Sequence, residues 1–422
     1  MLTIHRHGTA EYDETLEALG RRGDSDLERV EPAVREIIDA VKARGDEAIR
    51  ELTERFEART QKHIVVPREI WEARAAKVSS EVRDALRFAA ERIRKYHAHQ
   101  VESGFRYTED GIELGQRVLP VRAAGVYAPG GKARYPSTVL MAAIPAAVAG
   151  VERIVLCTPR ITPEIACAAL LAGVTEVIDA GGAQGIAALA YGTETVQPVD
   201  KIVGPGNIYV ACAKRLVFGH VDIDSIAGPS EILVVADDAA DPAVVAADLL
   251  SQAEHDEDAY PLLVTLSEKQ AQAVSDEVER QLEDLPRQEI ATASVKNNGY
   301  AFVVGDLDEA ARVADSLAIE HLNLSVADPD AMLPKIRAVG AVFLGYDTPE
   351  AAGDYAAGPS HVLPTGGAAR FASPLGVYDF LIRTSLIRYG REAIQKQADV
   401  LEALARLEGL EAHARAVAAR RK

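Results

Sequence analysis

The stretch that decides the fold runs from VRAAGVYAPGG (121–131) to KIVGPGNIYVACAKRLVFG (201–219). Four short apolar runs lie within it, and each is followed by a turn rich in glycine or proline and then by a segment of helical length. Continuous apolar runs of this kind are typical of strands that are buried on both faces of a parallel sheet. The stretch therefore predicts strand–helix units that build one parallel sheet with helices on both sides.

A second series of the same kind begins near Glu231. Its apolar runs start with ILVVAD (232–237) and LLVTLS (262–267) and end with GAVFLG (340–345). The first third of the chain is instead charged, with apolar residues at helical spacing, and a further helix rich in Ala, Glu and Arg is expected near the C-terminus. The sequence thus predicts an α/β protein with two doubly wound, incomplete Rossmann-like parallel-sheet domains and helical extensions at both ends.

This pattern suggests a division of the chain into four parts. We expect residues 1–20 to form an N-terminal extension and residues 121–231 to form a nucleotide-binding Rossmann-like domain. Because that sheet lies mid-chain, residues 21–120 and 232–375 are expected to pack together as one larger, discontinuous α/β domain. Residues 376–422 are expected to form a helical C-terminal tail. Two α/β lobes normally bind a ligand in the cleft between them.

Composition narrows the range of partners. The formal net charge of −18 argues against a general nucleic-acid binder, because such affinity depends on clustered Lys and Arg. The sequence has no apolar segment of about 18 residues and no apolar run near its start, so we expect no membrane partner and a cytoplasmic location. Cys157, Cys167 and Cys212 lie in apolar segments, which favours buried, reduced thiols over a disulfide framework.

Three glycine-rich turns follow predicted strands of the mid-chain sheet. They are residues 128–131, 181–185 and 204–207, and none spells G-x-G-x-x-G. A glycine-rich turn before a helix lets backbone N–H groups approach a phosphate, although one such turn alone is more often an ordinary tight turn. Three turns at equivalent strand ends of one sheet leave a dinucleotide site and ordinary tight turns as equal alternatives.

Two short motifs combine a histidine with an amide or a carboxylate. Gln252 and His255 are three residues apart on a predicted helix, so both side chains can point at one atom, such as a metal ion. A polar helix end is the favoured interpretation of that motif alone. Glu320 and His321 are usable as a general acid/base pair, because imidazole titrates near neutrality. Composition alone favours surface residues at a helix end.

Further acidic and histidine residues occur near the C-terminus. The loop EAAGDYAAGPSH places Glu350, Asp354 and His361 among small residues that permit close backbone approach. Asp354 is a plausible oxygen ligand and His361 a plausible substrate contact, with turn and capping roles as the ordinary alternative. Glu408 and His413 lie on the predicted last helix, where exposed charges normally form a solvated face.

Together these motifs resemble the histidinol dehydrogenase family. The similarity runs over nearly the whole chain and rests on long, ordered motifs: DSIAGPSE (224–231), SQAEHD (251–256), GVYAPGG (125–131), GPGN (204–207), IEHL (319–322) and GDYAAGPSHVLPTGGAARFASPLG (353–376). The resemblance implies one zinc site per subunit, made by Gln252, His255, Asp354 and His413. In that family the last ligand comes from the partner subunit, so the tail would contribute to the partner's active site in an intertwined homodimer.

The resemblance also implies a cofactor site and a reaction. NAD would lie on the mid-chain sheet near Tyr127, Gln184 and Asn207. Besides the zinc ligands, the implied substrate contacts are Ser230, His321, Glu350, His361 and Glu408. The family reaction is a four-electron oxidation of L-histidinol to L-histidine through bound L-histidinal, with zinc mainly orienting the substrate. His321 would take the alcohol proton, and Glu320 would activate the water that attacks the aldehyde.

Three other functions remain open at this stage. A related zinc- and NAD-dependent dehydrogenase could act on another small alcohol, such as a sulfonated diol, but Glu408 and His413 together favour histidinol. A zinc hydrolase with Glu320 as base would leave the three glycine-rich turns unexplained. A two-lobed binding protein without catalysis is disfavoured by the adjacent Glu320 and His321 and by the lack of an export signal.

Overall fold

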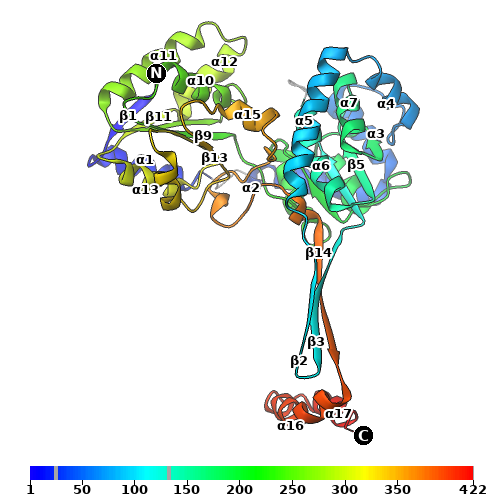
Figure 1. The fold of residues 1–422 in the computed structure, drawn as a ribbon. Coiled ribbons are helices and arrows are strands. Elements are labelled where there is room, and N and C mark those ends of the chain that lie inside the picture. Colours follow the sequence, from blue (N-terminus) through cyan, green and yellow to red (C-terminus); the bar gives the residue numbers. More distant parts are fainter. Residues whose placement is uncertain (23–26, 131–134, 422) are drawn as a thin grey trace.

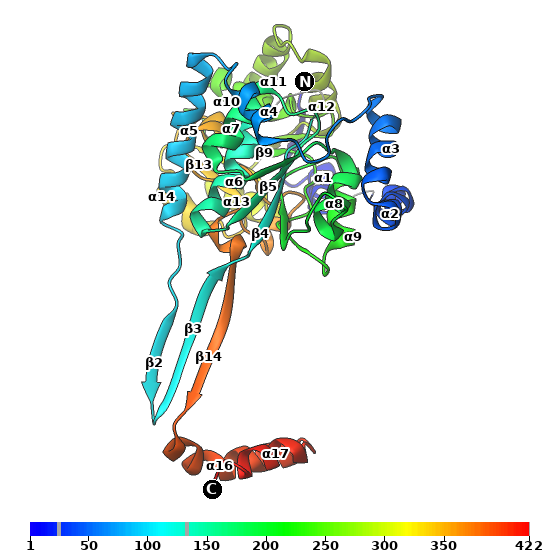
Figure 2. The same ribbon diagram turned by 90° about the vertical axis from the view of Figure 1, so that its right-hand side faces the viewer.

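The computed structural model describes residues 1–22, 27–130 and 135–421 of the chain. It consists of two α/β lobes side by side and a long, narrow arm that projects away from them (Figure 1). Two helices lie at the far end of the arm, as the second view also shows (Figure 2). The prediction of two parallel-sheet lobes is confirmed.

The mid-chain lobe contains a five-stranded, fully parallel sheet in the order β6-β5-β4-β7-β8. Its strands are β4 (Ala123–Tyr127), β5 (Arg153–Cys157), β6 (Glu176–Ile178), β7 (Lys201–Val203) and β8 (Asp222–Ile223). The intervening helices are α6 (Pro136–Ala149), α7 (Pro163–Ala172), α8 (Gly182–Tyr191) and α9 (Ile208–Val217). Strand order reverses between β4 and β7, which is the place where doubly wound sheets bind ligands.

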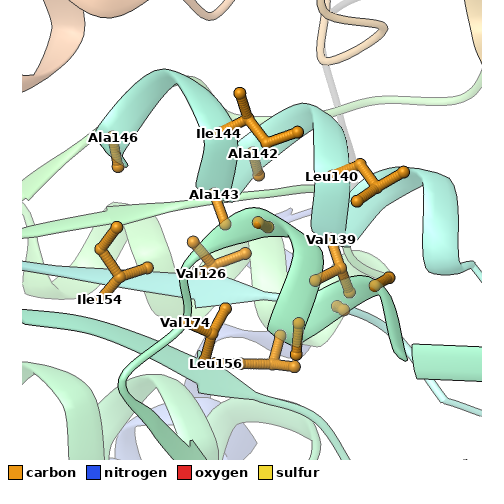
Figure 3. Packing of buried hydrophobic residues seen from close by; sticks show 14 of the residues in the cluster. Val126, Val139, Leu140, Ala142, Ala143, Ile144, Ala146, Ile154, Leu156 and Val174 are labelled. Atoms are coloured by element: carbon orange, nitrogen blue, oxygen red, sulfur yellow. The ribbon is translucent and has the colours of Figure 1, made fainter. Parts of the chain in front are cut away.

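The helices of this lobe lie close to the sheet because they are rich in alanine. Figure 3 shows Val139, Ala143 and Ala146 of α6 facing Val126 and Ile154 of strands β4 and β5. All of these side chains are fully or almost fully buried. The three cysteines are also buried and free, as expected.

The helices of the first third cover this same lobe. They are α2 (Leu27–Arg44), α3 (Asp46–Glu57), α4 (Arg68–Ala75) and α5 (Ser80–Ala98). Helix α2 packs on α8 and α9, α4 packs on α7, and α5 packs on α6 and α7. The predicted grouping of residues 21–120 with residues 232–375 is therefore wrong. The physical reason is that α6 to α8 are apolar on nearly every face and need a second layer of helices outside them.

The second lobe contains a six-stranded parallel sheet in the order β1-β11-β10-β9-β12-β13. Its strands are β1 (Thr3–Arg6), β9 (Glu231–Ala236), β10 (Tyr260–Thr265), β11 (Tyr300–Val303), β12 (His321–Ser325) and β13 (Ala341–Leu344). Its helices are α1 (Ala10–Gly20), α10 (Pro242–Ala253), α11 (Glu268–Leu282), α12 (Gln288–Asn298), α13 (Leu307–Leu317), α14 (Pro329–Met332) and η1 (Leu333–Lys335). From β9 onward the strand order repeats that of the first lobe.

Residues 1–20 belong to this second lobe and are not a separate extension, which corrects the expectation. Strand β1 pairs in parallel with β11, and α1 packs on α13. Edge pairing satisfies backbone groups of β11 that would otherwise face solvent. Loop residues after β13 include the short helices α15 (Glu350–Tyr355), η2 (Ala368–Arg370) and η3 (Val377–Phe380).

The arm is a three-stranded antiparallel sheet. Strands β2 (Phe105–Glu109), β3 (Ile112–Pro120) and β14 (Leu381–Tyr389) pair in the order β14-β3-β2, and α16 (Arg391–Leu407) and α17 (Glu411–Ala418) follow. Residues 376–422 are therefore not wholly helical as predicted, because LIRTSLIRY (381–389) pairs along its full length with β3. Within the described residues, no helix combines the length and apolar character that crossing a bilayer requires.

Candidate active site

The candidate site lies at the amino-terminal edge of the second sheet. Strands β9 and β12 are neighbours there, with His321 opposite Ile232, so Glu231, Glu320 and His321 come together. Helix α10 runs back toward this edge with Gln252 in its last turn, and His255 follows two residues after the helix ends. Both Glu320 and His321 are buried, so their interpretation as surface residues at a helix end is wrong.

The segment after α15 brings the mid-chain lobe to the same place. The His361 Nε2 atom lies 3.3 Å from Thr138 Oγ1 of α6, and Ser360 Oγ donates to the Met141 carbonyl at 3.2 Å. On the α5 side, Arg92 Nε donates to the Ala356 carbonyl at 2.7 Å. The site is therefore at the junction of the two lobes, as Figure 1 shows for α15.

The His321 ring has one nitrogen engaged and one nitrogen directed at carboxylates. Its Nδ1 lies 3.0 Å from the Glu231 carbonyl oxygen and therefore donates a proton to it. Its Nε2 lies 3.5 Å from Glu350 Oε1 and 3.8 Å from Asp354 Oδ1. Burial alone would lower the pKa of His321, but the surrounding carboxylates, Glu320 foremost, raise this pKa well above its usual value.

The three carboxylates around this ring differ in their proton affinity. Burial raises the pKa of Glu320, whose Oε2 accepts the Glu231 N–H at 2.9 Å. Burial and the nearby charge of Asp354 raise the pKa of Glu350 to about 7. Burial would raise the pKa of Asp354 too, but the neighbouring histidines, His321 foremost, lower it to about 2. This low pKa keeps the Asp354 carboxylate ionised at neutral pH.

Several polar atoms at this place lack a protein partner. Gln252 Nε2, His321 Nε2 and Glu350 Oε1 are buried and have no hydrogen-bond partner among the described residues. The ligand atoms of His321, Glu350 and Asp354 lie within 4.8 Å of one another. Buried polar groups are almost always paired in folded proteins, so this concentration of unpaired atoms indicates that the site binds a polar ligand or an ion.

His255 and His361 complete the group of histidines. Burial lowers the pKa of each, and the negative charge of Asp354 acts on both in the opposite direction. His361 Nδ1 donates to the Asp354 backbone carbonyl at 3.1 Å. Ser230, half-buried, lies one residue before β9. The structure thus brings together the predicted residues Gln252, His255, Glu350, Asp354 and His361 around the Glu320–His321 pair.

The predicted cofactor residues lie at the opposite, carboxyl edge of the first sheet. Tyr127 ends β4, and its hydroxyl accepts the Gly182 N–H at 3.0 Å. Gln184 is buried in the first turn of α8, and the Asn207 side chain caps α9 by accepting from the N–H groups of Tyr209 and Val210. Gly204 has φ +112°, and a Cβ there would lie 2.2 Å from the Tyr127 carbonyl oxygen. Gly131 of the first glycine-rich turn is outside the described residues.

Comparison with known proteins decides the family. A model of histidinol dehydrogenases matches residues 20–421. The chain is 52% identical to the histidinol dehydrogenase of Aquifex aeolicus over 97% of its own length and 96% of that protein. It is 51% identical to the Bacillus subtilis histidinol dehydrogenase, with 96% of each chain covered. The crystal structure of Elizabethkingia anophelis histidinol dehydrogenase superposes with a TM-score of 0.93 at 36% identity, covering 99% of this chain and 98% of that one.

This chain belongs to the histidinol dehydrogenase family. The protein is therefore an oxidoreductase, and the sequence-based assignment is confirmed.

Two residues implied for the site lie elsewhere in this dehydrogenase chain. Glu408 and His413 are exposed, and they belong to the helical pair at the far end of the arm. Both views show this pair well separated from the lobes and from α15 (Figures 1 and 2). The tail of the same chain therefore does not bring His413 to the other three implied zinc ligands, Gln252, His255 and Asp354.

Sequence reasoning missed a set of residues that support the site from behind. Asn323 Nδ2 donates to Asp248 Oδ2 at 2.9 Å and to the Thr348 carbonyl at 3.3 Å. Ser251 Oγ donates to Glu350 Oε2 at 2.9 Å. Asp248 lies one helical turn before Gln252 on α10, and this spacing was the signal in the sequence that could have placed Asp248 beside the site. These bonds tie α10, β12 and α15 together.

Asp248 gives this dehydrogenase a testable pH dependence. Burial raises the pKa of Asp248 to about 6. A raised carboxyl pKa contributes stability that is complete below the unfolded value near 4 and is lost as the pH rises through about 6. Between pH 5 and pH 7.5 the wild type should lose about 1 kcal/mol of unfolding free energy relative to Asp248→Asn.

Urea unfolding of metal-free protein at the two pH values measures this difference. Asp330→Asn, which changes an exposed carboxylate in the same lobe, is the matched control and should follow the wild type. Equal pH dependence of wild type and Asp248→Asn would show that this carboxyl titrates normally.

Proposed function

We propose that the protein oxidises L-histidinol to L-histidine, through bound L-histidinal, in a zinc- and NAD-dependent four-electron reaction. The observation that carries this proposal is the geometry of His321. One ring nitrogen is held by the Glu231 carbonyl, and the other is directed at the carboxylates of Glu350 and Asp354. The family supports histidinol oxidation in histidine biosynthesis, and the site supplies the proton-handling groups that an alcohol and an aldehyde oxidation require.

The donor set of this chain fits zinc. Gln252, His255 and Asp354 offer nitrogen and oxygen ligands, and Asp354 is the carboxylate held in its ionised form. The amide nitrogen of Gln252 is buried without a hydrogen-bond partner among the described residues, and the oxygen of the same amide is a ligand type that zinc accepts. His413 of a partner subunit would complete four ligands. Zinc would supply a Lewis-acid anchor for the imidazole and amino nitrogens of the substrate.

The chain's own residues handle the protons. The surrounding carboxylates raise the pKa of His321, and cations bound beside Asp354 would offset their charge and lower the pKa of this ring. His321 Nε2 then accepts the alcohol proton in the first oxidation, and Glu320 activates the water that attacks the aldehyde. Ser230, Glu350 and His361 contact the substrate.

NAD would supply the hydride acceptor for both oxidations. We assign its binding to the first lobe, near Tyr127, Gln184 and Asn207. Two of the three glycine-rich turns follow β4 and β7, which flank the point where strand order reverses. Gly182 has φ +60° at the start of α8 and donates its own N–H to Tyr127, and the N–H groups that follow it in the first turn would be available to a phosphate.

The arm supports an intertwined homodimer. Its strands and the two tail helices expose apolar side chains at a density unusual for a free surface: Phe105, Tyr107, Leu119, Ile382, Ile387, Val400, Leu404, Leu407 and Leu410. A second copy of the chain would cover them and would place the partner's Glu408 and the partner's His413 near the zinc ligands. Glu408 would pair with the amino group of the substrate.

The proposal predicts the stoichiometry of the reaction. Purified protein should form two NADH per L-histidinol consumed, because the aldehyde is oxidised before release. Removal of metal with a chelator should abolish this activity, and zinc should restore it. One NADH per substrate would instead indicate a simple alcohol dehydrogenase, and no NADH with full hydrolytic activity on an ester panel would favour a zinc hydrolase.

Glu320→Gln should separate the two oxidations. The amide keeps the size and the hydrogen-bonding capacity of the side chain but cannot accept a proton from water. The variant should therefore form the first NADH and stall at the aldehyde, with loss of the second oxidation by at least about 100-fold. Trapping L-histidinal with an amine reagent and counting NADH measures this outcome. Full histidine formation by Glu320→Gln would contradict the assigned role.

The partner's tail can be tested by mixing two inactive variants. His255→Ala removes a ligand from the lobe, and His413→Ala removes the ligand from the tail. In a mixed dimer one of the two sites would combine an intact lobe with an intact tail, so randomly paired subunits should recover about a quarter of wild-type activity and zinc content. No recovery in confirmed mixed dimers would show that each tail serves its own subunit.

A further inference from the structure

A buried ion pair lies directly behind the catalytic residues. Arg22 and Glu231 form two parallel N–O contacts of 2.8 Å each, and their side chains are only 2% and 0% exposed. The remaining Arg22 donors reach the carbonyls of Leu19 and Leu317, at 2.9 and 2.7 Å. Burying such a pair is costly and often adds no net stability, so stability alone does not account for this pair.

Glu231 contacts both residues of the catalytic pair. Its backbone N–H donates to Glu320 Oε2 at 2.9 Å, and its own Oε2 accepts the Glu320 N–H at 3.3 Å. The Glu231 carbonyl oxygen accepts from His321 Nδ1 at 3.0 Å. The other carboxylate oxygen of Glu231 accepts the Gly366 N–H at 2.7 Å. Glu231 thus fixes both the position of the Glu320 carboxylate and the tautomer of the His321 ring.

We propose that Arg22 and Glu231 are positioning residues that hold Glu320 and His321 in their reactive orientation. This inference rests on the roles proposed above for Glu320 and His321. The planar guanidinium of Arg22 contacts both carboxylate oxygens of Glu231, which fixes the orientation of that carboxylate. The carboxylate in turn holds the backbone in place where β9 and β12 begin. Glu231 in turn holds the proton of His321 on Nδ1, which leaves Nε2 directed toward Glu350 and Asp354.

The ion pair between Arg22 and Glu231 links two segments that are distant in the sequence, the end of α1 and the start of β9. Arg22 follows α1, which packs on α13, so the N-terminal segment of the second lobe reaches the amino edge of its sheet. Without Arg22 the buried Glu231 carboxylate has no counter-charge, and it must take up a proton or turn toward water. Either change shifts the hydrogen bonds that hold Glu320 and His321. A displacement of this kind, remote from the reacting atoms, can reduce a rate by about 100-fold.

The test uses the zinc-loaded protein and three variants. Arg22→Met removes the charge and both hydrogen bonds, while Arg22→Lys keeps the charge but not the planar, two-point contact. Leu19→Ala is the matched control, because it loosens the same N-terminal segment at a buried apolar residue and leaves the Glu231 carboxylate paired. For each protein the measurements are zinc content, melting temperature, kcat, KM for L-histidinol, and NADH formed per substrate with the aldehyde trapped.

We expect Arg22→Met to lower kcat by about 10- to 100-fold with KM changed less than about twofold. The NADH yield should fall from two toward one, because a misplaced Glu320 lets the aldehyde be trapped. Arg22→Lys should recover part of kcat. Leu19→Ala should lower the melting temperature but keep the wild-type kcat and yield.

The inference is overturned if the Arg22 variants match Leu19→Ala, with a lowered melting temperature and unchanged kcat and yield. If Arg22→Met does not fold, Arg22→Lys decides the question by the same two values, since it retains the buried charge. A failure of the proposed function is distinguishable, because the wild type itself would then fail to form two NADH per L-histidinol.

Discussion

Parallel pairing of β9 with β12 is the interaction on which the rest of the site depends. This pairing places Glu231 against Glu320 and His321, and the two glutamates exchange backbone-to-carboxylate hydrogen bonds. The crossover rule then directs α10 back to the same edge, so Gln252 and His255 arrive without any special local structure. Doubly wound sheets usually bind ligands at the carboxyl ends of their strands. Here the second sheet uses its amino edge, while the first sheet presents its carboxyl edge and its glycine-rich turns.

The site concentrates charge that the protein alone does not neutralise. Glu320, Glu350 and Asp354 surround His321, and several buried atoms remain unpaired among the described residues. Such an arrangement costs stability, since buried charges and polar groups need partners. The burial of Asp248 adds to this cost at neutral pH. A bound cation and a polar substrate would supply the missing partners, so the stability lost here is consistent with a site built for a charged ligand.

The arm is the part of the chain on which the proposed dimer depends. Its antiparallel strands carry α16 and α17 far from the lobes, together with Glu408 and His413. No described residue of the chain covers the apolar side chains exposed along the arm. In the proposed dimer, burial of these apolar side chains would stabilise the assembly, and the same contact would bring the partner's His413 to the zinc site. Catalysis and assembly would then be coupled, because neither subunit completes its site alone.

Much of this protein was predictable from local patterns. Continuous apolar runs between helical segments predicted both parallel sheets, and the motifs around Gln252, Glu320 and Asp354 predicted the family and most of the residues that come together at the candidate site. Long-range packing was not predictable. The helices of the first third cover the mid-chain lobe because α6 to α8 are apolar all round, and β14 is a strand because β3 lies beside it.

The sequence by itself determined the elements and the chemistry of the side chains, because hydrophobic periodicity and residue type are local properties. Only the tertiary structure decided that Arg22 and Glu231 lie behind Glu320 and His321 and that Glu408 and His413 lie far from them. Such arrangements join segments that are distant in the chain, so they leave no local pattern in the sequence.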